Sequence, residues 1–188
     1  MKSFIFVVSL FTCLAGHSEA KKIPSDSIFQ IQTNWINQDN KVVKIESLEG
    51  KPTILAMVYL SCKFLCPTII SEVQNLESKI DQKKREKVQV LLASFDPEKD
   101  TPAVIKAYAK KRKLDSPHWT LLTSKTDSTP RELAAVLDFK YKKIKGGDFT
   151  HSFMIVVLNE SGVPVARIDS ANQDKQPLIN ALNTLLEK

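Results

Sequence analysis

The 188-residue chain has few residues of the types that often bind metals or act in catalysis, with three cysteines and three histidines. It also has only five glycines, the residue that gives the backbone most flexibility. Its hydrophobic content is 43%, and it shows no internal repeat or low-complexity tract. This composition excludes an intrinsically disordered chain. The length is sufficient for one well-buried core, so we expect a single domain.

Long hydrophobic runs are also scarce, and one of them lies at the N-terminus, from Phe4 to Ala15. Lys2 precedes this run, and Ser18-Glu19-Ala20 places small residues at positions −3 and −1 of a cleavage site. The run is shorter than the about 20 residues that a membrane-spanning helix needs. We therefore predict that residues 1–20 are a secretory signal and that residues 21–188 form an exported, periplasmic protein.

Two alternatives to cleavage remain open. One is an uncleaved anchor that holds the protein at the outer face of the inner membrane, and the other is a lipid on Cys13. The sequence Leu10-Phe11-Thr12 is a poor lead-in to a lipidated cysteine, which disfavours the second alternative. Without residues 1–20, Cys62 and Cys66 are the only cysteines, and the sequence shows no further membrane segment.

The formal net charge of +6 comes largely from three lysine-rich segments, residues 83–85, 110–113 and 140–145. Each lies at or near the end of a predicted helix, where positive charge complements the helix dipole. The favoured interpretation is solvated helix ends, and the alternative is a docking surface for an acidic partner. We expect no nucleic-acid partner, because aromatic and basic residues are not interleaved.

One segment organises the chain. The apolar run from Thr53 to Leu60 follows Gly50-Lys51-Pro52 and predicts a buried central strand. Cys62 and Cys66 come directly after it, and apolar residues at helical spacing follow Pro67. The cysteines therefore lie where a core strand gives way to a helix, whose free N–H groups and dipole stabilise a thiolate.

A structural disulfide between these cysteines is the plainest interpretation in an exported protein. It would close a loop of five residues, for which chain entropy contributes about 2 kcal/mol, against about 3 kcal/mol for a fifteen-residue loop. Two cysteines on one helix face have Cβ atoms about 5–6 Å apart, whereas a disulfide requires roughly 3.5–4.5 Å. A bridging metal fits the relaxed geometry better. A soft-metal site and a redox-active dithiol both remain open.

The rest of the chain alternates strand and helix patterns. Residues 28–48 predict a hairpin at one sheet edge, and the strand–helix–strand unit after it should have a right-handed crossover. Thr101-Pro102 predicts a helix start, Thr129 to Glu132 a capping box, and residues 153–168 an antiparallel hairpin. The expected strands span residues 53–60, 88–95, 119–122, 153–158 and 163–168, and the expected helices span 69–80, 102–112, 130–137 and 178–185. This order predicts a three-layer α/β sandwich with a mixed sheet and an N-terminal β-hairpin extension.

His118 and His151 are the histidines that remain after the signal. We interpret His118, near a turn, as an ordinary surface residue, whereas His151 lies at the mouth of the strand predicted from residue 153. Two thiolates and one imidazole form a trigonal set that suits copper, particularly Cu(I), while zinc normally takes a fourth ligand. Asp96 leaves another central strand, and it either accepts a hydrogen bond near this site, steers a partner, or only forms a turn.

Taken together, these features resemble the Sco/SenC family of thioredoxin-like copper proteins over about residues 30–170. The matching residues are Gly50-Lys51, the pair Cys62 and Cys66 with Pro67 after it, the segment Asp96-Pro97-Glu98-Lys99-Asp100-Thr101-Pro102, and the segment Asp148-Phe149-Thr150-His151-Ser152. The resemblance implies a thioredoxin fold, in agreement with the element order. It also implies Cys62, Cys66 and His151 as copper ligands, and delivery of copper to the dinuclear CuA centre of cytochrome c oxidase subunit II.

The chain departs from this family between the cysteines. Family members commonly carry Pro-Asp-Val there, whereas this chain has Lys63-Phe64-Leu65. The missing carboxylate and the added lysine make the pocket less anionic, which implies lower metal affinity or altered thiol reactivity. The client protein is therefore open.

Two functions of different classes follow from these observations. The first is a copper metallochaperone, which is not an enzyme and handles Cu(I) or Cu(II). The second is an extracytoplasmic thiol–disulfide oxidoreductase that works through Cys62 and Cys66, with a peroxidase of the peroxiredoxin class as a weaker third. Only the first requires His151. We expect a monomer whose client is subunit II or another copper or thiol protein.

Overall fold

The computed structural model describes residues 22–187. Its centre is a seven-stranded sheet with the strand order β2-β1-β5-β4-β3-β8-β9. The strands are β1 Asn34–Asn37, β2 Val42–Lys44, β3 Thr53–Val58, β4 Gln89–Ser94, β5 Trp119–Thr123, β8 Ile155–Leu158 and β9 Pro164–Ile168. β3, β4 and β5 run parallel, and the neighbours on both sides are antiparallel to them. The predicted mixed sheet is therefore confirmed.

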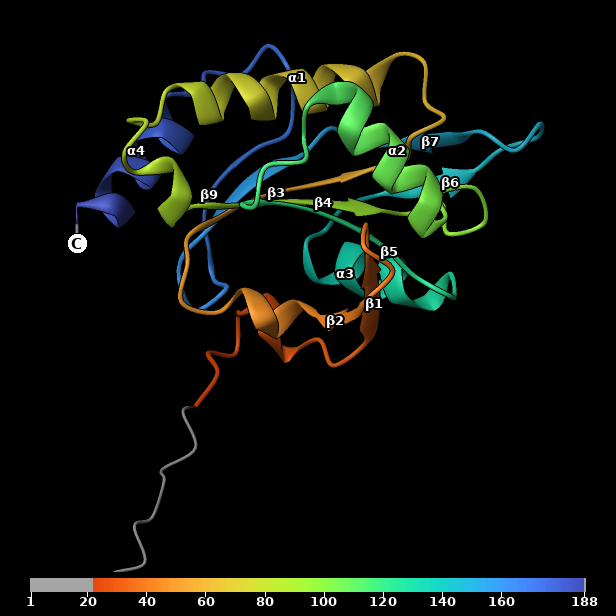
Figure 1. Cartoon of the computed structure of the whole chain (residues 1–188), viewed down its shortest axis with the longest axis horizontal. Helices are drawn as coiled ribbons and strands as arrows, with labels where there is room; N and C mark the ends of the chain where they lie inside the picture. Colours follow the sequence, from red (N-terminus) through yellow and green to blue (C-terminus); the bar gives the residue numbers. More distant parts are fainter. Residues whose placement is uncertain (1–21, 188) are drawn as a thin grey trace, which may run out of the picture.

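Helices cover both faces of this sheet. The helices are α1 Leu65–Ser78, α2 Pro102–Arg112, α3 Ser128–Val136 and α4 Gln176–Leu186. α1 and α4 lie along one face, α3 lies beneath the other, and α2 packs on β5 (Figure 1). The result is the expected thioredoxin-like three-layer sandwich.

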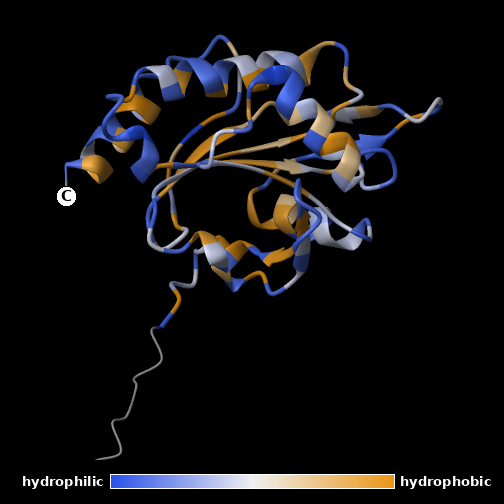
Figure 2. Cartoon of the chain, viewed as in Figure 1, coloured by the Kyte–Doolittle hydropathy of each residue, from blue (hydrophilic) through white to orange (hydrophobic). Residues whose placement is uncertain are grey.

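The hydrophobic core lies between these layers. Every residue of β3 and of β8 is buried, because helices cover both faces of the central strands. Figure 2 shows the hydrophobic central strands enclosed by helices whose outer faces are hydrophilic. Burial on both faces explains why the central strands read as continuous apolar runs in the sequence.

The connections at the carboxyl ends of the parallel strands hold the polar residues of interest. β3 leads into α1 through residues 59–64, and β4 leads into α2 through residues 95–101. Thr101 caps α2 by accepting a hydrogen bond from the Val104 N–H at 3.4 Å, and Pro102 begins the helix, both as predicted. These two connections lie at one edge of the sheet, the usual place for a site in an open α/β sheet.

The N-terminal hairpin is confirmed, with shorter strands than residues 28–48 would allow. β1 and β2 pair with Trp35 opposite Val43, and Asn40 takes a positive φ of 60° at the turn. Short 3₁₀ segments, Ile28–Gln30 and Ile45–Leu48, replace the outer parts of the predicted strands. β1 also pairs with β5, so the hairpin extends the sheet at this edge.

Two local predictions are wrong. The helix expected from residue 130 begins at Ser128, so Thr129 lies inside it and is buried, and the capping box does not form. Residues 140–145 do not end a helix: β6 Tyr141–Lys143 pairs with β7 Phe149–His151 in a separate two-stranded hairpin. Of the three lysine-rich segments, residues 110–113 end α2, whereas residues 83–85 begin five residues after the last residue of α1 and residues 140–145 begin four residues after the last residue of α3.

The predicted signal, residues 1–20, lies outside the described residues and stays a prediction, as does the boundary of the mature protein. Within residues 22–187, no helix is both long and apolar enough to cross a membrane.

Candidate metal centre

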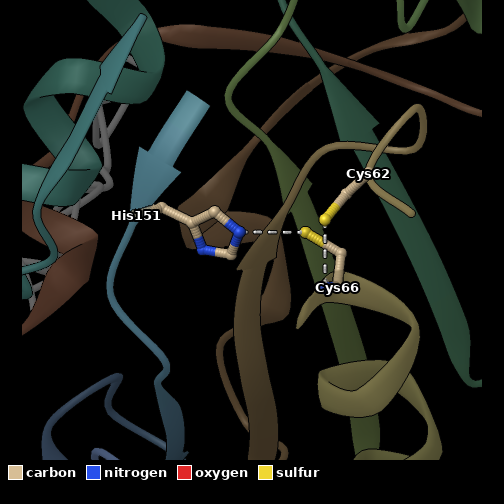
Figure 3. Close-up of side chains that lie close together, drawn as sticks. All are labelled: Cys62, Cys66 and His151. Atoms are coloured by element: carbon tan, nitrogen blue, oxygen red, sulfur yellow. Dashed lines mark hydrogen bonds between the residues drawn. The ribbon is translucent and has the colours of Figure 1, made fainter. Parts of the chain in front are cut away.

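The three predicted ligands come together at the carboxyl end of β3. Cys62 lies in the turn after β3, Cys66 lies in the first turn of α1, and His151 ends β7 (Figure 3). The two Sγ atoms and a ring nitrogen of His151 all lie within 4.8 Å of one another. Within the described residues this is the one group of three or more such side chains with that geometry.

The orientation of His151 prepares one nitrogen to bind a metal. Nδ1 lies 2.8 Å from the Ser152 carbonyl oxygen, and because a carbonyl only accepts, Nδ1 carries the proton. Nε2 of the neutral ring is then left with its lone pair, 3.5 Å from Sγ of Cys66. A second hydrogen bond that fixes tautomer and ring orientation is typical of metal-binding histidines.

The two cysteines differ in acidity. Burial acts to raise the pKa of Cys62, but hydrogen bonds, first those from the N–H groups of Cys66 and Phe64, outweigh it and lower the pKa to about 6. The Cys66 N–H lies 3.4 Å from Sγ of Cys62. Burial raises the pKa of Cys66, although the Tyr59 N–H donates to its sulfur. Cys62 is therefore a thiolate at neutral pH, whereas Cys66 keeps its proton.

Aromatic side chains surround the imidazole. The His151 ring meets the Tyr59 ring edge-on with centroids 5.7 Å apart, and the Phe95 and Phe139 rings lie 5.3 and 6.1 Å away. The Phe149 ring packs on Tyr59 at 5.2 Å and so joins β7 to the end of β3. Burial, followed by the neighbouring Cys62, raises the pKa of Tyr59 to about 12. The packed rings restrict His151 to one orientation.

Asp100 supports the turn that carries Cys62, a role that was not predicted from the sequence. One of its carboxylate oxygens, Oδ2, accepts hydrogen bonds from the Leu60 N–H at 3.0 Å and the Ser94 hydroxyl at 2.5 Å. Burial raises the pKa of Asp100 to about 6. Asp100 belongs to the same segment, residues 96–102, as Asp96. The sequence pattern alone does not show which of the two carboxylates contacts the turn that carries Cys62.

Asp96 does not reach the three ligands. Its side chain is buried, and Oδ2 has no hydrogen-bond partner among the described residues. It lines a cavity of about 230 Å³ together with Phe95, Arg131 and Tyr141. Burial raises the pKa of Asp96. Phe95, the residue before it, is the one that contacts His151.

The expectation for His118 is wrong. Its side chain is only 14% exposed, because Nε2 lies 2.6 Å from Oε1 of Glu77 on α1. The indole N–H of Trp119 donates to the other oxygen of Glu77 at 3.1 Å. This trio joins α1 to β5, and the metal-ligand group does not include it.

The arrangement fits a soft metal ion in trigonal coordination. Metal–ligand bonds of about 2.0–2.3 Å place three ligands around a trigonal ion roughly 3.5–4 Å from one another, which requires only a small contraction of the observed group. Two sulfurs and an imidazole suit copper. Cys66 must lose its proton when the metal binds, so binding is linked to pH.

Fold and site thus define a thioredoxin-like protein with a two-cysteine, one-histidine metal-ligand group. The family model SCO1/SenC matches residues 23–187. The chain belongs to the SCO1/SenC family, as its resemblance to Sco/SenC proteins implied.

Several relatives are similar to the chain over most of its length. The SCO1 protein homolog of Bacillus subtilis is 31% identical over 147 residues, which are 76% of this chain and 72% of the relative. The structure of Bradyrhizobium japonicum ScoI with copper bound has a TM-score of 0.67 at 26% identity, covering 81% of this chain and 96% of ScoI. BsSco, in which a disulfide switch was identified, has a TM-score of 0.69 at 24% identity, covering 82% and 91%. A relative that shares the fold therefore binds copper, the metal that was predicted for this chain.

Proposed function

We propose that this protein is a copper metallochaperone that delivers copper to the CuA centre of cytochrome c oxidase subunit II. One observation carries the proposal: the structure brings the Nε2 lone pair of His151 to the two cysteine sulfurs. A dithiol reductase has no need of that imidazole. The copper-bound ScoI relative supports the same metal, and the CuA client follows from the family resemblance.

The geometry suits transfer by ligand exchange. Cys62 is partly exposed and Cys66 is buried, so an incoming acceptor thiolate approaches the copper from the side of Cys62. A trigonal ion accepts this additional ligand, the bond to Cys62 breaks, and the remaining bonds follow as the acceptor completes its own site. The copper keeps its oxidation state throughout, and the better ligand set of the acceptor drives the transfer.

A thiol–disulfide oxidoreductase is the second candidate, favoured by the low pKa of Cys62. In that reaction the Cys62 thiolate attacks a client disulfide and displaces one client thiolate. Cys66, once deprotonated, displaces the other and closes the Cys62–Cys66 disulfide, so the client gains two electrons that the cysteines lose. We place either activity in the periplasm, after removal of residues 1–20 or with them as an inner-membrane anchor.

One experiment separates the two functions. Copper transfer to the soluble copper domain of oxidase subunit II and reduction of a disulfide substrate are measured for wild type, Cys62→Ser, Cys66→Ser and His151→Ala. We expect copper transfer to fail in all three variants, and disulfide reduction to fail only in the cysteine variants. If His151→Ala still transfers copper at the wild-type rate, the metallochaperone proposal is wrong and the reductase takes its place.

A further inference from the structure

An exposed aromatic side chain lies between the two cysteine ligands. Phe64 is 84% exposed, the highest value among the large hydrophobic side chains of the described residues. It is the N-cap residue of α1, and its side chain makes no capping hydrogen bond. Aromatic side chains at the centre of protein interfaces supply much of the binding energy. Phe64 therefore has the character of an anchor for another molecule beside the metal-ligand group.

A second exposed apolar side chain lies on the hairpin that carries His151. Ile144, 44% exposed, follows β6 at the end of the hairpin. The hairpin projects at the same end of the molecule as the loop between β3 and α1 (Figure 1). Its turn is fixed internally, where the Ile144 N–H and the Asp148 carbonyl lie 2.8 Å apart, and externally, where Lys99 donates to the Gly147 carbonyl at 2.9 Å. These hydrogen bonds hold the turn that carries Ile144.

Positive charge surrounds these two side chains. We call the exposed lysines of the three segments around the ligands the basic rim: Lys63, Lys99, Lys140, Lys142, Lys143 and Lys145. The exposed carboxylates in these segments are Glu98 and Asp148, and Asp127 lines the same cavity as Lys142 and Lys143; Glu98 is already ion-paired with Lys143. Asp96 and Asp100 are buried. The surface around the metal-ligand group is therefore cationic.

We propose that Phe64, Ile144 and the basic rim form a docking surface for a protein partner that presents carboxylates around an apolar depression and carries its own thiols. The inference rests on the proposed function, because it specifies the partner for that site. Opposite charge steers the encounter and sets the orientation, and the apolar anchors hold the complex. Phe64 stands between Cys62 and Cys66 in the sequence, and His151 ends β7 of the hairpin, so an occupant of this surface lies beside the ligands and must bring an atom that binds copper or exchanges with sulfur. A lipid surface offers no such atom.

Two synthetic dithiol peptides test the charge preference. Both carry a leucine cluster beside the dithiol, and they differ only in flanking glutamates or flanking lysines. The copper-loaded protein should transfer copper to the glutamate peptide about tenfold faster at low salt, and the ratio should approach unity at high salt. The double variant Lys142→Glu/Lys145→Glu should abolish or reverse the preference, whereas Lys83→Glu, beyond the far end of α1, should retain it. Equal rates for the two peptides with wild type at low salt would overturn the proposal.

The anchor is tested with the same peptides. Phe64→Ser should bind copper as wild type does but transfer it about tenfold more slowly. Val42→Ser is the matched control, because Val42 is also exposed, at 62%, but lies on the edge strand β2. If Phe64→Ser and Val42→Ser behave alike, Phe64 is not an anchor.

A parallel assay distinguishes failure of this proposal from failure of the copper function. The peptides are supplied as disulfides, and the reduced, metal-free protein reduces them by forming its own Cys62–Cys66 disulfide. The glutamate preference and its loss in the lysine variant should appear here even if the protein holds no copper. Two results would overturn the protein partner. If wild type binds anionic phospholipid vesicles at physiological salt and Phe64→Ser does not, the surface binds a membrane. If wild type dimerises with increasing concentration and Phe64→Ser does not, the surface binds a second copy of the chain.

Discussion

At the scale of single residues, the two cysteines have been given different environments by a few hydrogen bonds. The Cys66 N–H, in the first turn of α1, donates to Sγ of Cys62. Cys66 itself is buried, and its sulfur contacts the Tyr59 N–H and the His151 ring. Free N–H groups at a helix start favour a thiolate, and burial favours a thiol. Sγ of Cys62 is therefore the sulfur that can react with a partner or bind a metal first, and Sγ of Cys66 follows once it loses its proton.

This difference predicts selective alkylation of the reduced, metal-free protein. Iodoacetamide should modify Cys62 with a rate that rises through pH 6 as the thiolate forms and levels off above neutrality, because the pKa is about 6. Cys66 should remain largely unmodified over that range, because burial shields it and raises its pKa. Peptide mapping by mass spectrometry measures both rates. A midpoint for Cys62 near the ordinary thiol value of about 8.5, or equal rates for both cysteines, would contradict this account.

At the scale of elements, Asp100 couples three segments that together present the site. Its carboxylate contacts the chain leaving β3, the last residue of β4 and the turn before α2. The position of Cys62 therefore depends on a hydrogen bond from a different strand connection, which no local sequence pattern reports.

Asp100→Asn should change how stability depends on pH. The carboxyl pKa is raised from 3.8 to about 6 in the folded protein, so between those values the folded state binds more protons than the unfolded state. Stability then falls as pH rises through this window, by about 3 kcal/mol in total for a shift of that size. The amide of the variant accepts the same hydrogen bonds without titrating and should remove this decrease.

Urea unfolding at intervals between pH 4 and 7 measures the effect for wild type and Asp100→Asn. Asp115→Asn, which removes an exposed carboxylate, is the matched control and should keep the wild-type profile. If the free energy of unfolding of wild type instead rises between pH 4 and 7, compared with that of Asp100→Asn, the folded protein stabilises the carboxylate. That result would contradict the raised pKa of Asp100.

At the scale of the whole molecule, the sheet could be predicted because β3, β4 and β8 are covered on both faces and therefore appear as apolar runs. The β6–β7 hairpin could not, since its strands are three residues long and two of the three residues of β6 are lysines. Tyr141, Phe149 and His151 are the hairpin rings that pack against Phe95. The grouping of Cys62, Cys66 and His151 was predictable from residue type at strand ends, whereas the contacts of Asp100 and Tyr59 join segments far apart in sequence.

The central claim is that the fold unites Cys62, Cys66 and His151 into one copper site, and copper titration of the reduced protein tests it most directly. Wild type should bind one copper per chain, and the cupric form should show sulfur-to-copper charge-transfer absorption. Cys62→Ser and Cys66→Ser should lose tight binding. His151→Ala should weaken cupric binding most, because two thiolates alone still hold Cu(I) in near-linear coordination. Wild-type cupric affinity and an unchanged absorption spectrum in His151→Ala would contradict the account.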